Sequence, residues 1–306
     1  MKRYDFDPDL HEGLRDKIDS RVIYRGTYED TDEISTLTIP EGIEEIAENA
    51  FREYEHIKEL VLPQSLRRIS AAAFSGCKNL TRVVFSEGLL LIADEAFAFC
   101  SSLFSVNLPD TVEYIGEGAF EGLASLTSLR LSERLRHIGP AAFAFCFNLR
   151  DVTVPDSVEL VEFNAFASCF SLTGVRLSAS MRMIDESTFE GCRSLKAVDM
   201  PYGLVSIGRR AFSGCESLES LILPVSLLKI GFDAFSGCSS LVRLALPKSL
   251  TEIEDTDAFS GCDSLSEIAY AGSREGWESL MRAKTLTVMR KDLSCVTPKI
   301  ICLDMK

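Results

Sequence analysis

The sequence predicts an α/β solenoid of about ten stacked repeats, with a curved parallel sheet on the concave face and short helical turns and extended pieces elsewhere. The pentapeptide AFSGC starts at Ala73, Ala211, Ala234 and Ala258, and its variant AFAFC starts at Ala96 and Ala142. Phenylalanine recurs at one constant interval eight times, and the ninth interval is longer by a single position. A fixed period of about 23 residues is typical of solenoids. The recurring rings are Phe51, Phe74, Phe97, Phe120, Phe143, Phe166, Phe189, Phe212, Phe235 and Phe259.

Each repeat contains a short strand. Apolar residues stand nine and eleven positions after the Phe and alternate with polar or variable neighbours, as in LTSLRL at residues 126–131. Alternation with a period of two predicts a strand with one buried face. Proline follows this strand in most copies, for example Pro109 and Pro155, and serine follows it in the others. Because proline has no N–H to donate, it ends the strand.

A second extended piece and a turn complete the repeat. Leucine and isoleucine stand three apart, as in Leu135 and Ile138, and a glycine then follows in four copies (Gly116, Gly139, Gly208 and Gly231). Glycine at this point indicates either a positive φ or a close backbone approach. Ala142, Cys146 and Leu149 then keep the i, i+4, i+7 spacing of a short helical turn. No repeat can bury its own apolar edge, so the repeats must stack.

The full pattern, LxxLxLPxxLxxIGxxAFxxCxxL, resembles the BspA-type leucine-rich repeat family over roughly residues 34–271. Tyr54 and Leu123 replace the cysteine in two copies, and Thr188 replaces the alanine in one. The resemblance implies a leucine-rich repeat solenoid and a non-catalytic scaffold for protein–protein interaction. It further implies a bacterial surface or adhesion protein that binds a host or partner protein. An intracellular scaffold is the alternative.

The repeats divide the chain into three parts. Residues 1–33 form an N-terminal cap, with an amphipathic helix carrying Leu10, Leu14 and Ile18 and a strand within residues 21–28. Residues 34–271 form the solenoid. Residues 272–306 form a C-terminal cap, with a helix that places Trp277 over the last repeat and strands at residues 285–289 and 299–303. Such end pieces cover the open edges of a solenoid core.

Charge and hydropathy narrow the possible partners. The net charge of −14 opposes binding to nucleic acid and to anionic membranes. No run approaches the length of a membrane span, and no apolar signal region follows the first residues. The sequence as it stands predicts a cytoplasmic protein, or an extracellular or cell-surface one if a signal peptide has been removed. We expect a protein or peptide as the partner, and a monomer rather than an oligomer.

Eight of the ten cysteines stand three residues after a repeat Phe. A disulfide ladder or a metal–thiolate stack could explain this row of eight cysteines, which we call the cysteine file. Stacked side chains point in parallel, however, and Leu123 fills the same position, so we expect free buried thiols. No CxxC pair is present. Cys295 and Cys302 lie outside the file and could bond in an oxidising compartment.

The sequence holds no recognisable catalytic or cofactor motif. His11, His56 and His137 have no partner at a known catalytic spacing. The acidic runs at residues 28–33 and 254–257 are more typical of solvated loops than of Ca²⁺ sites. We therefore predict no catalytic residues, no metal site and no cofactor. An enzyme or a metal protein is the remote alternative.

Two surfaces are candidates for partner binding. The first is the concave sheet face, at Asn107, Arg130, Thr153, Arg176 and Asp199, where an arginine could fork onto a carboxylate of the partner. A merely solvated face is the alternative. The second is an aromatic patch of Phe99, Phe145, Phe147 and Phe170, which exceeds what the repeat core requires. These rings could instead pack on one another across adjacent turns.

Overall fold

The computed structural model describes residues 20–27, 35–281, 288–289 and 295–303. The chain divides into two compact units, Met1–Leu149 (unit 1) and Arg150–Lys306 (unit 2), and each is described by itself. The expected N-terminal helix, with Leu10, Leu14 and Ile18, lies outside the described residues.

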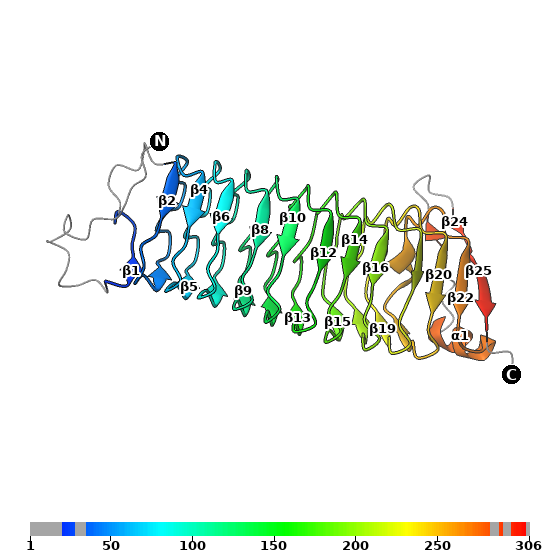
Figure 1. The fold of residues 1–306 in the computed structure, drawn as a ribbon. Helices are drawn as coiled ribbons and strands as arrows, with labels where there is room; N and C mark the ends of the chain where they lie inside the picture. Colours follow the sequence, from blue (N-terminus) through cyan, green and yellow to red (C-terminus); the bar gives the residue numbers. More distant parts are fainter. Residues whose placement is uncertain (1–19, 28–34, 282–287, 290–294, 304–306) are drawn as a thin grey trace. The chain divides into compact units, whose positions relative to one another are not determined.

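Unit 1 is a parallel β-solenoid in which each coil contributes one longer and one shorter strand (Figure 1). The longer strands pair in the orders β2-β4-β6 and β8-β10, and the shorter ones pair in the order β1-β3-β5-β7-β9-β11. The longer strands are β2 (Thr36–Thr38), β4 (Glu59–Val61), β6 (Arg82–Val84), β8 (Ser105–Asn107) and β10 (Ser128–Arg130). The shorter strands are β1 (Val22–Ile23), β3 (Glu45–Ile46), β5 (Arg68–Ile69), β7 (Leu91–Ile92), β9 (Tyr114–Ile115) and β11 (His137–Ile138).

Unit 2 repeats this organisation and adds the C-terminal elements (Figure 1). Its longer strands pair as β12-β14-β16 and β18-β20-β22-β25, and its shorter strands pair as β15-β17-β19-β21. The longer strands are β12 (Asp151–Thr153), β14 (Gly174–Arg176), β16 (Ala197–Asp199), β18 (Ser220–Ile222), β20 (Arg243–Leu246), β22 (Glu267–Tyr270) and β25 (Lys299–Cys302). The other elements are β13 (Leu160–Val161), β15 (Met183–Ile184), β17 (Ser206–Ile207), β19 (Lys229–Ile230), β21 (Glu252–Ile253), the 3₁₀ helix η3 (Thr256–Phe259), α1 (Arg274–Met281), β23 (Val288–Met289) and β24 (Cys295–Val296).

The repeat Phe rings form the centre of each core, as the sequence predicts. All ten side chains are fully buried. In unit 1, Phe74 stacks on Phe51 and Phe97 with centroid separations of 5.1 and 5.3 Å and nearly parallel planes. In unit 2, Phe212 stacks on Phe189 and Phe235, at 5.5 Å in both cases. Offset stacking of this kind adds to the free energy of burial.

The segment around each Phe is a series of turns, which differs from the helical turn that the spacing predicts. The residue two before the Phe has a positive φ in nearly every coil, and so does the residue two after it. The backbone N–H groups of these two residues and of the Phe donate to carbonyls of the next coil. Ala72, Phe74 and Gly76, for example, donate to Asp94, Ala96 and Ala98, each over 2.8 Å. An α-helix cannot form here because these N–H groups are directed out of their own turn.

The glycines after the shorter strands serve a close approach and not a positive φ. A Cβ on Gly139 would lie 2.7 Å from the carbonyl carbon of Gly116 in the preceding coil. A Cβ on Gly231 would come equally close to Gly208. Neither Gly139 nor Gly231 is among the residues with positive φ. Of the two explanations that the sequence left open, close backbone contact between coils is therefore the correct one.

The eight cysteines in the file carry free, buried thiols, as expected. Their role goes beyond filling space, because seven of them donate a hydrogen bond from Sγ to the carbonyl of the Phe in the preceding coil. These donor–acceptor distances are 3.1–3.4 Å, for Cys77, Cys100, Cys146, Cys192, Cys215, Cys238 and Cys262. Burial raises the pKa of the Cys146 thiol to about 12. The Cys146 thiol is therefore a protonated donor at neutral pH.

Thiol labelling tests this arrangement. We expect iodoacetamide at pH 8 to leave Cys146 unmodified in the folded chain and to modify it rapidly in urea, because the thiolate is the reactive form. Cys302 is a free thiol that is only half-buried, so it provides an internal control that should react in the folded chain. The measurement is peptide mass spectrometry after timed labelling. Native labelling of Cys146 as fast as that of Cys302 would contradict the buried donor role.

The C-terminal elements agree with the sequence prediction where they are described. The hydroxyl of Ser273 accepts the N–H of Gly276 and caps α1. Trp277 and Met281 of α1 are buried, and the Trp277 ring lies 5.7 Å from that of Tyr270. Strand β25 pairs in parallel with β22, which places Ile300 beside Ile268. Within the predicted strand at residues 285–289, β23 occupies the two residues that are described. The side chain of Cys295 lies outside the described part.

Candidate protein-binding surface

The outward face of each unit is formed by the first and third residues of the longer strands. In β8 and β10 of unit 1, Asn107 is paired in register with Arg130, and both side chains are exposed. In unit 2, Thr153, Arg176 and Asp199 occupy one row across β12, β14 and β16, and all three are exposed. Each unit therefore brings its own share of the predicted polar residues together on one face.

Both predicted arginines already bind carboxylates of their own chain. Arg130 donates from Nη2 to Asp110 Oδ1 over 2.8 Å and from Nη1 to the carbonyl of Leu108 over 2.7 Å. Arg176 donates from Nη2 to both oxygens of Asp156, at 3.0 and 2.9 Å. The guanidinium groups that we expected to bind a carboxylate of the partner therefore bind carboxylates within the chain. The signal that could have revealed this is a Pro-Asp pair placed so that the Asp precedes the Arg by 20 residues in both cases.

The Asp156 carboxylate also accepts the backbone N–H of Ala179, and its contribution to the stability of the fold depends on pH. The N–H of Ala179, the largest cause, and the Arg176 guanidinium lower the pKa of Asp156. Because the pKa is lower in the folded chain, the carboxylate stabilises the fold above its unfolded-state pKa. This contribution is lost as the pH falls through the folded-state value.

An Asp156→Asn variant tests this titration. We expect the difference in urea midpoint between wild type and variant to be greatest near pH 7 and to shrink towards pH 3, as the wild-type carboxylate becomes protonated. An Arg134→Gln variant is a control, because no described residue forms a salt bridge with Arg134. A difference between wild type and Asp156→Asn that does not change with pH would show that ionisation of Asp156 does not matter.

The predicted aromatic patch is solvent-exposed. In unit 1, Phe99 is 50% exposed and Phe145 is 43% exposed. The Phe99 ring covers Gly122, where a Cβ would lie 2.6 Å from the ring, and Phe145 contacts Phe147 edge to face with a centroid separation of 6.2 Å. In unit 2, the guanidinium carbon of Arg193 lies 4.9 Å from the centroid of the exposed Phe170 ring. Phe145 and Phe147 therefore contact each other within one coil while both remain exposed, which is not the packing across adjacent turns that was the alternative.

Sequence reasoning did not select the most exposed large apolar side chains of the described residues. These are Tyr202, Ile222 and Val225 in unit 2, which are 89%, 81% and 77% exposed. The signal was available, because Ile222 is the first apolar residue after Asn107 in the outward-facing column. We call these three residues the unit 2 apolar patch.

No described group of three or more His, Cys, Asp or Glu side chains has the arrangement of a metal site. Within the acidic run at residues 254–257, Glu254 pairs with Lys229 and accepts the N–H of Phe232. The run at residues 28–33 lies outside the described residues. Over the part of the chain that the structure describes, no helix has both the length and the apolar character required to cross a membrane.

The repeat geometry agrees with a known family. A family model for the BspA type leucine rich repeat region, in six copies, matches residues 21–133, 91–215, 119–241 and 159–279. The chain belongs to the BspA-type leucine-rich repeat family. The solenoid of each unit, the leucine pattern and the free cysteine file are thus features of a BspA-type protein.

Solved leucine-rich repeat structures resemble this BspA-type chain. A leucine rich cell surface protein from Faecalibacterium prausnitzii is 27% identical, with a TM-score of 0.44, over 81% of this chain and 82% of that one. A leucine rich repeat protein from T. pallidum is 28% identical, with a TM-score of 0.48, over 64% and 82%. A leucine-rich repeat protein from Bacteroides ovatus is 20% identical, with a TM-score of 0.37, over 88% and 92%. A search of curated proteins finds no significant match.

Proposed function

We propose that this BspA-type chain is a non-catalytic scaffold that binds a protein or peptide through the outward face of its longer strands. One observation carries the proposal: inward positions repeat the same residue types in every coil, whereas outward positions change from coil to coil. The third strand residue is Val84, Asn107 and Arg130 in successive coils of unit 1, and Thr153, Arg176, Asp199 and Ile222 in unit 2. Because the inward residues complete the core, the outward ones can vary to suit a partner.

The polar rows and the aromatic patch are the contact surfaces that we propose. Asn107 with Arg130, and Thr153 with Arg176 and Asp199, offer hydrogen-bond donors and acceptors, and Arg130 and Arg176 would act as pairs with their aspartates. Phe99, Phe145 and Phe147 offer half-exposed rings of the kind enriched at interfaces. The acidic net charge of −14 favours a protein over a nucleic acid.

Family membership supports a bacterial cell-surface role in which the partner is a protein of the host or of a neighbouring cell. The second possibility is an intracellular scaffold. Protease treatment of intact native cells, followed by fractionation, distinguishes the two possibilities. A surface protein is digested under these conditions, whereas an intracellular protein is not.

Site-specific photo-crosslinking tests the scaffold. A photoreactive phenylalanine analogue replaces Asn107 on the outward face, Phe145 in the aromatic patch, or the exposed Glu113 next to the shorter strand β9 as a control. Each variant is irradiated in host and bacterial extracts. We expect one protein to become attached at Asn107 or at Phe145 and not at Glu113. Equal attachment at all three positions, or attachment at none, would contradict the proposed function.

A further inference from the structure

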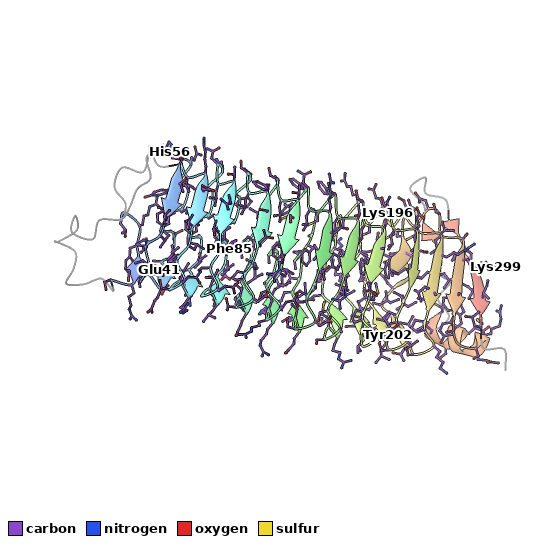
Figure 2. All side chains as sticks on the ribbon, in the orientation of Figure 1. Glu41, His56, Phe85, Lys196, Tyr202 and Lys299 are labelled. Atoms are coloured by element: carbon purple, nitrogen blue, oxygen red, sulfur yellow. The ribbon has the colours of Figure 1, made fainter. Side chains whose placement is uncertain are left out.

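The unit 2 apolar patch has the features of a binding site. Tyr202, labelled in Figure 2, and Val225 occupy equivalent positions in successive coils, immediately after Pro201 and Pro224. The two coils are in direct contact, because the hydroxyl of Ser226 donates to the carbonyl of Tyr202. Ile222 belongs to the same coil as Val225 and ends strand β18. Side chains of this size are rarely left so exposed as a group unless they contact a partner.

The patch replaces the ion pairs that occupy the same positions elsewhere. Arg130 binds Asp110, and Arg176 binds Asp156, in each case 20 residues earlier. The same offset relates Ile222 to Tyr202, and it relates Ala245 to Val225. The positions of Arg130 with Asp110 and of Arg176 with Asp156 are therefore each covered by a solvent-exposed ion pair. The equivalent positions of Ile222 with Tyr202 and of Ala245 with Val225 are occupied by apolar side chains.

Cations surround this patch in a protein that is otherwise acidic. Arg243 pairs in register with Ser220, which places it diagonally next to Ile222, and Lys248 follows Val225 by one repeat. Arg182 donates from Nη1 to the carbonyl of Gly203, next to Tyr202, over 3.2 Å. Among the described residues, no carboxylate forms a salt bridge with Arg182, Arg243 or Lys248.

Two acidic side chains lie on the same face. Asp199 precedes Ile222 by one repeat and is paired in register with Arg176. Glu267 is paired in register with Arg243. Three cations and the Asp199 carboxylate therefore flank the apolar side chains, and the Glu267 carboxylate lies one strand beyond Arg243. Cations outnumber carboxylates among these five groups, so charge complementarity favours an anionic partner although the chain as a whole carries a charge of −14.

We propose that the unit 2 apolar patch and its flanking cations bind an acidic polypeptide segment that carries large apolar side chains. The inference rests on the proposed scaffold function and adds a further contact site and the chemistry of the segment that binds there. The apolar side chains of the segment cover Tyr202, Ile222 and Val225, and its carboxylates pair with Arg182, Arg243 and Lys248. A second copy docked patch to patch would bring two sets of these cations into one interface, so charge complementarity favours an acidic segment.

Selection from a random peptide library displayed on phage tests this inference with the full chain. We expect the enriched peptides to combine Asp or Glu with large apolar residues. A variant with Tyr202→Ser, Ile222→Ser and Val225→Ser should bind a selected peptide at least about tenfold more weakly. An Arg243→Glu, Lys248→Glu variant should bind it more weakly and with less dependence on salt. Met183→Ser, which changes an exposed apolar residue of β15, is the matched control and should bind normally. Circular dichroism confirms that each variant is folded.

Each other outcome has a defined meaning. Enrichment of basic peptides, or of peptides that the serine variant still binds, overturns the acidic-segment inference and leaves the scaffold function in place with its site elsewhere. Patch-dependent self-association in sedimentation velocity also overturns the inference, because the occupant is then a second copy. The complete absence of enriched peptides overturns the inference, and the photo-crosslinking result decides separately whether the scaffold function fails with it.

Discussion

Replacing Phe120 with alanine is expected to lower the free energy of unfolding by about 3–5 kcal/mol. The Phe120 side chain is fully buried, and its ring stacks between Phe97 at 5.5 Å and Phe143 at 5.3 Å. Removal of the ring therefore leaves a cavity that two rigid neighbours cannot close. Urea denaturation followed by far-UV circular dichroism measures the loss.

Phe145→Ala is the matched control for this substitution. It removes the same ring two residues further along the coil that follows, but the Phe145 side chain is 43% exposed. We expect a smaller loss than for Phe120→Ala, because less apolar area is buried at Phe145 and its removal leaves no closed cavity. A loss for Phe120→Ala as small as that for Phe145→Ala would show that the stacked file of rings does not support the core.

Replacing Ser168 with proline is expected to cost about 3 kcal/mol or more. Ser168 has a φ of 58°, and its N–H donates to the carbonyl of Glu190 in the next coil over 2.6 Å. Proline requires a φ near −65° and has no N–H, so it is incompatible with the backbone and also removes the bond between coils. The urea midpoint of the full chain is again the measurement.

Ser168→Gly separates the backbone effect from the loss of the serine side chain. Glycine keeps the N–H and adopts a positive φ without strain, so we expect the variant to be as stable as wild type or more stable by up to about 1 kcal/mol. Glycine already occupies this position in six coils, as at Gly191 and Gly214. If proline is tolerated as well as glycine, the bonds between Phe turns do not stabilise the fold.

The spacing of the repeat was sufficient to predict the strands, their parallel register and the buried file of Phe rings. A residue such as Leu129 has its counterpart Val106 one repeat earlier, and the two are paired in register in the structure. This prediction succeeds because a constant period leaves only one offset at which every apolar residue meets an equivalent residue in the next coil.

The contacts of the candidate site were harder to predict from the sequence than the fold. The outward positions were identified correctly, but the arginines selected there are bound to Asp110 and Asp156, and the more exposed Ile222 was passed over. Arg130 and Asp110 are separated by 20 residues, which is shorter than the repeat, so their contact depends on how one coil lies against the next. Strand alternation identifies the face of a residue but not its neighbour across the coil boundary.

The sequence by itself determined the period, the family, the identity of the core residues and the free state of the buried thiols, because each depends on residue types that recur at a fixed spacing. Only the tertiary structure decided the conformation of the Phe turns, the thiol donors and the ion pairs. The turn around Phe74 adopts alternating φ signs because its N–H groups find acceptors at Asp94, Ala96 and Ala98. Cys100 donates to the carbonyl of Phe74, which lies 26 residues earlier. Such bonds join atoms that meet only after the coils stack, so no local preference of the chain encodes them.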